Sequence, residues 1–312
     1  MSIRLGYQIP NFTYPGIPVE NLFDTVAAQA REAEASGFDT VLVMDHFYQL
    51  PGIGAPENAM LEAYTTLGAL ASATETIQLS TLVTGNTYRN PALLAKTVTT
   101  LDVVSKGRAV LGIGAGWFER EHHDYGFEFG SFAQRFERLE EALTIISPML
   151  KGKPASLDGK WYTARGAMNN PRVRPNIPIM LGGSGEQKTF RLAARFADHM
   201  NIICDVDELP RKVEVLRQRC EEIGRDPATL ATSYLVMGLV GETEQEVKEL
   251  GETVPEDRRN RAFLGTPGQV AEQLKERVLD AGIGGITINL IRTGHRPGVV
   301  SQVGAALKPL VQ

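Results

Sequence analysis

Cysteine is nearly absent from this chain, which has two in 312 residues, Cys204 and Cys220. Two thiols provide neither a disulfide framework nor the C-x-x-C pairs of a zinc site, and such low usage is typical of a reducing compartment. No apolar run approaches the roughly 18 residues that a membrane-spanning helix needs. The first residues lead directly into a predicted strand, without a signal peptide. We therefore expect a cytoplasmic protein with no membrane partner.

The chain also lacks a strong excess of charge of either sign. Its 32 basic and 37 acidic residues give a net charge of −5, and no block of like charge occurs. A nucleic-acid partner is therefore not expected. With 43% hydrophobic and 22% charged residues, the composition is that of an ordinary globular protein, long enough for one large α/β domain or two smaller ones.

What the sequence does contain is a regular alternation of strand-like and helix-like segments. Strands are predicted over 3–9, 40–44, 77–84, 109–113, 178–181, 199–204, 232–240 and 285–291. Helices are predicted over 19–36, 61–73, from Pro91 onward, 132–150, 188–196, 209–223, 244–250, 267–281 and 299–310. Residues 151–176, rich in proline and glycine, interrupt this rhythm and are interpreted as an inserted loop or hairpin. Eight strand-plus-helix units predict a single (β/α)₈ TIM-barrel domain over residues 1–312, with an open doubly wound sheet as the alternative.

Polar residues follow several predicted strands and should meet at one mouth of the barrel. Asp45 and His46 come directly after the second strand. A histidine there can exchange a proton near neutral pH, with a neighbouring group to orient it. The alternative is a loop histidine bonded to backbone. We expect His46 to handle protons and Asp45 to orient it.

Glycines end the fourth strand in the pattern Gly112-x-Gly114-x-Gly116. A dinucleotide-binding fingerprint, G-x-G-x-x-G, would need glycine at position 117, which is Trp117, and no acidic residue after a following strand completes the unit. The glycines can instead let a flat ring approach the backbone closely, or they form a tight turn.

A second glycine-rich segment, Gly182-Gly-Ser-Gly-Glu-Gln-Lys-Thr189, resembles a P-loop but has Gln187 where that motif needs glycine. A glycine turn that enters a helix N-terminus is nevertheless suited to anions. We therefore predict a phosphate site there, to which Lys188, Arg191 and Arg195 could add positive charge.

Other chemistries find little support in the sequence. His122-His123-Asp124 looks like a metal motif, but adjacent side chains rarely point at one ion, and no H-E-x-x-H occurs. No metal is therefore expected. The serine-hydrolase pattern G-x-S-x-G is absent as well. Glu119, Glu121, His122 and Tyr125 are candidates to line a substrate pocket, or they belong to a solvated loop.

Six segments together make the chain resemble the luciferase-like oxidoreductase superfamily, most closely its branch that depends on the deazaflavin coenzyme F420. The resemblance covers essentially the whole chain. Its segments are Ser36-Gly-Phe-Asp-Thr-Val-Leu-Val-Met-Asp-His46, Thr84-Gly-Asn-Thr-Tyr-Arg-Asn-Pro-Ala92, Leu111-Gly-Ile-Gly-Ala-Gly-Trp117, Leu181-Gly-Gly-Ser-Gly185, Ala197-Asp-His-Met-Asn201 and Leu264-Gly-Thr-Pro-Gly268.

The resemblance implies a role for each matching position. Asp45 and His46 match a pair beside the reactive edge of the coenzyme ring. The strand around Thr81-Leu82 matches a bulge that often holds a non-proline cis peptide behind the ring. The remaining matches are Thr84 beside the ring, Ala115 and Gly116 in the loop next to it, and Gly182, Gly183 and Ser184 at its phosphate.

The chain also departs from the sugar-phosphate dehydrogenase of this branch. That enzyme has a glutamate after the glycine that matches Gly116, where this chain has Trp117, and an asparagine where it has Arg120. A sugar-phosphate substrate is therefore not carried over. Trp117 makes the pocket more aromatic, and Glu121, His122 and Tyr125 remain candidate substrate contacts.

These observations predict an F420-dependent oxidoreductase that transfers a hydride between the coenzyme and a small organic substrate. An FMN-dependent monooxygenase on the same scaffold, using reduced flavin and O₂, is the first alternative. A protein that binds F420 or flavin without turnover is the second. By analogy with the family, we expect a homodimer.

Overall fold

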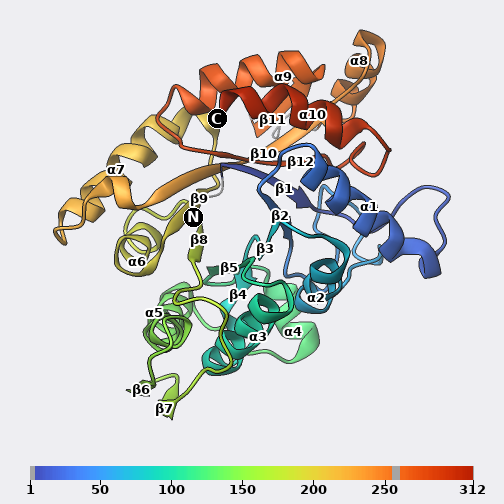
Figure 1. The fold of residues 1–312 in the computed structure, drawn as a ribbon. Coiled ribbons are helices and arrows are strands. Elements are labelled where there is room, and N and C mark those ends of the chain that lie inside the picture. Colours follow the sequence, from blue (N-terminus) through green and yellow to red (C-terminus); the bar gives the residue numbers. More distant parts are fainter. Residues whose placement is uncertain (1–3, 255–260, 312) are drawn as a thin grey trace.

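Eight parallel strands close into a barrel, which confirms the predicted fold (Figure 1). The computed structural model describes residues 4–254 and 261–311. In order around the barrel the strands are β1 (Leu5–Ile9), β2 (Thr40–Val43), β3 (Gln78–Thr81), β5 (Ala109–Gly114), β8 (Ile179–Gly183), β9 (His199–Ile202), β10 (Ala231–Val240) and β12 (Ile286–Asn289). Pairing of β12 with β1, in the register Leu5 with Ile286, closes the ring. The first predicted strand began at residue 3, which lies outside the described residues.

Helices surround the strands on the outside of the barrel (Figure 1). They are α1 (Leu22–Ala35), α2 (Ala63–Ala73), α3 (Pro91–Val104), α5 (Phe132–Leu150), α6 (Thr189–Phe196), α7 (Leu209–Glu221), α8 (Glu244–Glu252), α9 (Pro267–Leu274) and α10 (Val299–Leu307). Short helical turns are η1 (Val19–Asn21), η2 (Asn86–Tyr88), η3 (Val206–Glu208), η4 (Pro227–Thr229), η6 (Lys275–Leu279) and η7 (Lys308–Leu310). No helix among the described residues is long and apolar enough to cross a membrane.

Local sequence signals explain where the helices near the site begin. Ser131 and Gln134 form a reciprocal capping box at the start of α5. Asn90 accepts hydrogen bonds from the first backbone N–H groups of α3, and Pro91 occupies a position where no N–H is needed. The predicted starts of these two helices, at Pro91 and Phe132, agree with the structure.

The inserted segment is a hairpin, as predicted. Strands β6 (Ala155–Asp158) and β7 (Thr163–Ala167) pair antiparallel, apart from the barrel sheet. The Glu141 carboxylate on α5 accepts hydrogen bonds from the backbone N–H groups of Lys160, Trp161 and Tyr162, each at 2.9 Å. These hydrogen bonds hold the hairpin against α5, beside which it lies in Figure 1.

The structure corrects the sequence-based prediction in three places. The single strand predicted over 77–84 is two strands, β3 and β4 (Thr84–Gly85), and the non-proline cis bond between them joins Leu82 and Val83, one residue later than expected. The predicted loop after β5 contains a helix, α4 (Glu119–Tyr125). A strand that was not predicted, β11 (Ala262–Gly265), pairs with the second half of β10.

Candidate functional site

The segments that the sequence singled out converge on one cavity of about 600 Å³. They come from the loops after β2, β5 and β8 and from β4, at the carboxyl ends of the strands, together with the first turns of α5. Its lining includes Asp45, His46, Leu82, Val83, Thr84, Gly114, Ala115, Gly116, Trp117, Arg135, Gly182, Gly183, Ser184 and Ile203. His46 and Ser184, far apart in the chain, therefore lie on the wall of one cavity.

Glycines keep one wall of this cavity open. A Cβ at Gly182 would lie 2.8 Å from Val83 Cγ1, and a Cβ at Gly114 would lie 3.0 Å from Val83 Cγ2. Gly116 has a φ of +79°, which side chains of L-residues rarely adopt. A larger residue at Gly182 or Gly114 would press against Val83, which lines the cavity, and one at Gly116 would strain the backbone.

The imidazole of His46 lies at this cavity with its side chain 12% exposed. Its Nδ1 is 2.9 Å from Glu121 Oε2. The rings of Trp117 and Phe118 meet the imidazole edge-on, with centroids 5.6 and 5.9 Å away. A carboxylate on one side and aromatic rings on the other thus fix the orientation of the imidazole.

Glu121 is fully buried and does not line the cavity, contrary to its expected place as a substrate contact. Its Oε1 accepts hydrogen bonds from the backbone N–H groups of Phe47 (2.6 Å) and Tyr48 (2.9 Å). Its Oε2 accepts one from the hydroxyl of Tyr88 at 2.7 Å, besides facing His46. Burial raises the pKa of Glu121, but these hydrogen bonds outweigh it, so the pKa lies below its ordinary value.

Asp45 was expected to orient His46, and the structure gives it a different partner. Its carboxylate accepts two hydrogen bonds from the guanidinium of Arg89, at 2.7 and 2.9 Å, and one from the N–H of Gly85 at 3.1 Å. Asp45 is 2% exposed. Burial raises its pKa, and Arg89 only partly opposes that rise. Adjacent residues of an extended chain point in opposite directions, which is why Asp45 and His46 have separate partners.

A chain of hydroxyl groups lies behind the cavity. Thr81 donates to the carbonyl of Gly112 at 2.9 Å, so the 2.8 Å bond between Thr81 and Thr84 must carry the proton of Thr84. Tyr64 then donates to Thr84 at 2.6 Å. Thr84 lines the cavity with a hydroxyl that can only accept a further bond, whereas Thr81 stands behind it.

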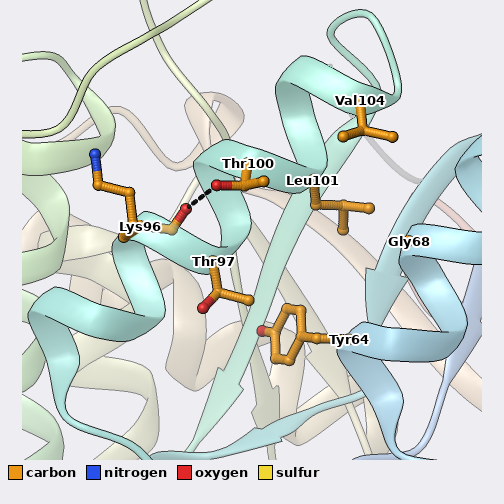
Figure 2. A pocket seen from close by; sticks show the side chains of 7 residues that line it. All are labelled: Tyr64, Gly68, Lys96, Thr97, Thr100, Leu101 and Val104. Carbon is orange, nitrogen blue, oxygen red and sulfur yellow. Dashed lines mark hydrogen bonds between the residues drawn. The ribbon is translucent and has the colours of Figure 1, made fainter.

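Tyr64 also reaches the outside of the barrel. It lines a groove of about 280 Å³ between α2 and α3, which Figure 2 shows from close by. None of the predicted site residues lines that groove.

Two further candidates lie away from the cavity. His122 is fully buried, with Nδ1 2.8 Å from the carbonyl of Phe118 and Nε2 2.6 Å from Thr87 Oγ1, and burial lowers its pKa. Tyr125 packs its ring 4.6 Å from that of Phe47. Neither contributes to the cavity lining. Among the described residues, no group of three or more histidine, cysteine or acidic side chains could hold a metal ion.

The end of the cavity beside α6 has groups that could bind an anion. Gly183 ends β8, and Ser184 and Gly185 lie in the turn that leads to α6. The N-terminus of a helix has free N–H groups and the positive end of the helix dipole. Arg135 also lines the cavity, and its Nε donates to the carbonyl of Gly116 at 3.1 Å. Arg135 was not predicted from the sequence, because nothing in the pattern of α5 distinguishes its cavity-facing residues.

A second cavity of about 490 Å³ adjoins the first, since Trp117 and Ile203 line both. Its remaining lining combines apolar side chains with a few polar ones, and comes from the loops after β2 and β9, from β10, from the residue before β11 and from the end of β12. These residues are Leu50, Pro51, Ile53, Cys204, Tyr234, Leu235, Met237, Arg261, Asn289 and Ile291. Trp117, 60% exposed, therefore stands between the two cavities.

The cavity, lined by His46 and by glycines, lies at the carboxyl-terminal mouth of a closed (β/α)₈ barrel. Enzymes with this fold have their active sites at that face. The chain belongs to the luciferase-like monooxygenase family, whose sequence profile matches residues 3–253.

Similar proteins include both deazaflavin and flavin enzymes. An F420-dependent glucose-6-phosphate dehydrogenase of Microbacterium testaceum is 37% identical over 169 residues, which are 53% of this chain and 48% of that protein. The match thus spans about half the length of that relative. The F420-dependent tetrahydromethanopterin reductase of Methanopyrus kandleri superposes with a TM-score of 0.81 at 18% identity, covering both chains fully. A Baeyer-Villiger monooxygenase of Pseudomonas putida in complex with FMN superposes with a TM-score of 0.78 at 19% sequence identity, covering 100% of this chain and 99% of that one.

Proposed function

We propose that this protein is an F420-dependent oxidoreductase that transfers a hydride between the deazaflavin and a small organic substrate. The observation that carries the proposal is the convergence of His46, Thr84 and the two glycine segments around one cavity. The choice of F420 over FMN is supported by the 37% identical relative, whose name includes that coenzyme. The flavin monooxygenases share the fold at much lower identity.

The residues present fit such a coenzyme. A cavity of about 600 Å³, in which a Cβ at Gly182 or Gly114 would crowd Val83, suits a flat ring. Thr84, Ala115 and Gly116 would hold the ring, with Leu82 at its back. Gly182, Gly183 and Ser184 would hold the phosphate beside the N-terminus of α6.

When bound, the coenzyme would provide the hydride chemistry, while the protein would bind or release the proton. When an alcohol is oxidised, its carbon loses a hydride and its hydroxyl loses a proton. His46 takes that proton on Nε2, because Nδ1 faces Glu121. In the reverse direction, His46 returns it to the carbonyl oxygen. Thr84, whose own proton is committed to Thr81, can only accept a hydrogen bond from the ring.

The second cavity is proposed to take the substrate. It shares Trp117 with the coenzyme cavity, so a molecule there would lie beside the ring edge and His46. Its walls are apolar for the larger part and include the polar side chains of Tyr234, Arg261 and Asn289, which favours an alcohol or ketone with an apolar body. Glucose 6-phosphate, the substrate in the name of the 37% identical relative, is not proposed, because Trp117 and Arg120 replace residues of that enzyme's pattern.

The test is to titrate the purified protein with F420 and with FMN, following quenching of cofactor fluorescence. We expect F420 to bind at least tenfold more tightly, and the complex to reduce or oxidise F420 with one of a panel of secondary alcohols and ketones. Tight FMN binding with oxygen uptake would establish the monooxygenase instead. If His46→Ala leaves every redox activity unchanged, a binding function without turnover gains support.

A further inference from the structure

We propose that Glu121 is a positioning residue that holds neutral His46 in the tautomer protonated on Nδ1, so that Nε2 is the proton-accepting atom. The catalytic consequence rests on the proposed function, whereas the tautomer itself can be measured without any cofactor. Sequence reasoning offered Asp45, the adjacent acidic residue, for this role; the geometry assigns it to a residue 75 positions away.

The direction of the hydrogen bond follows from what a carboxylate can do. An ionised carboxylate only accepts, so Nδ1, 2.9 Å from Oε2, must carry the proton that joins them. A neutral imidazole has one N–H, and Nε2 is then left with a lone pair. Among the described residues, the hydrogen-bond partner of the His46 side chain is Glu121, which faces Nδ1. No second partner on Nε2 within that part of the chain therefore favours the other tautomer.

Glu121 is itself held ionised and in place. Three donors besides His46 bind it: two backbone N–H groups on Oε1 and the hydroxyl of Tyr88 on Oε2. A fully buried carboxylate with four such bonds has its pKa below the ordinary value. The backbone donors belong to Phe47 and Tyr48, the two residues that follow His46. Glu121 therefore fixes both the backbone after His46 and the ring of His46.

Glu121→Gln separates these two tasks. The amide oxygen can still accept both backbone N–H groups where Oε1 does now. The amide nitrogen then takes the place of Oε2 and donates to Nδ1, which requires the proton of His46 to reside on Nε2. A role confined to supporting the loop would leave the tautomer unchanged. The matched control is Glu119→Gln, on the same helix but exposed.

The decisive measurement is nitrogen NMR of the cofactor-free protein labelled at histidine, at about pH 9, where ordinary imidazoles are neutral. His46→Asn identifies the His46 signals among those of the five histidines. We expect wild type and Glu119→Gln to show a protonated Nδ1 at His46, and Glu121→Gln to show a protonated Nε2. Protonated Nε2 in wild type would overturn the proposal even if Glu121→Gln fails to fold, and so would a protonated Nδ1 in a folded Glu121→Gln.

Kinetics form the second arm once a substrate is known. Glu121→Gln should lower kcat by roughly 10- to 100-fold, the usual loss when the group that orients a functional histidine is altered. The Kd for F420 should stay within about threefold, since Glu121 does not line the cavity. An unchanged kcat together with the expected tautomer shift would refute the catalytic consequence and the role of His46, but leave the positioning intact. Absence of any F420 binding would refute the proposed function alone.

Discussion

Asp45, which lines the cavity, forms an ion pair with Arg89. We expect Arg89→Gln to destabilise the protein strongly. Asp45 is buried, and Arg89 provides two of the three hydrogen bonds that the structure gives its carboxylate. Removing one partner of a buried pair typically costs about 3–5 kcal/mol, because the other charge stays buried without compensation. We expect a loss of that size in the free energy of unfolding at pH 7, measured by urea denaturation.

The pH dependence of this loss follows from the pKa of Asp45. Burial raises that pKa above 3.8, the value of the exposed group, and loss of Arg89 raises it further. Between the unfolded and the folded pKa, the folded state binds more protons, so stability falls as pH rises through this window. The deficit of Arg89→Gln relative to wild type should therefore be largest at neutral pH and shrink toward pH 4.

Two further variants make the reasoning refutable. Asp45→Asn combined with Arg89→Gln removes both charges and should recover at least about 1–2 kcal/mol relative to Arg89→Gln alone. Arg120→Gln, which loses an exposed pair with Asp124, should cost less than about 0.5 kcal/mol. A loss below about 1 kcal/mol in Arg89→Gln, or no recovery in the double variant, would show that the pair does not compensate a buried charge.

Three other outcomes are expected. His199 is buried with its pKa lowered to about 3, so stability is lost as pH falls below about 6.5. Between pH 7 and 5, the free energy of unfolding of His199→Asn, measured by urea denaturation, should fall by about 2 kcal/mol less than that of wild type. An equal fall in both proteins would contradict the lowered pKa of His199. Gly182→Ala should weaken F420 binding at least tenfold, because the added methyl group crowds Val83. The control, Gly268→Ala, adds a methyl group in open space and should leave the Kd unchanged. Equal Kd values for the two variants in fluorescence titrations would contradict the placement of the ring beside Gly182. Trp117→Ala should raise KM for an apolar substrate about tenfold and leave the melting temperature within about 2 °C, since the ring is exposed; an unchanged KM would remove Trp117 from the substrate site.

Local signals determined how much of the fold could be predicted. The helix predicted over 132–150 is α5 with the same bounds, and the capping box that the structure shows at Ser131 explains why it begins there. The short helix α4 was expected to be loop because its residues are mostly charged or polar, and β11 has only four residues. Such short segments are stabilised by contacts that lie elsewhere in the chain. The homodimer, the single domain and the roles of the site residues stay predictions.

The sequence by itself determined that a barrel would carry Asp45, His46 and two glycine segments to its carboxyl-terminal mouth. These residues come directly after predicted strands, and the carboxyl ends of parallel strands meet at one face of the barrel. Only the tertiary structure decided which side chains meet there. Glu121 turns inward to His46, Asp45 turns to Arg89, and Arg135 reaches the cavity from α5. Partners in a folded core are chosen by direction and distance in space, and neither is encoded in the spacing of residues along the chain.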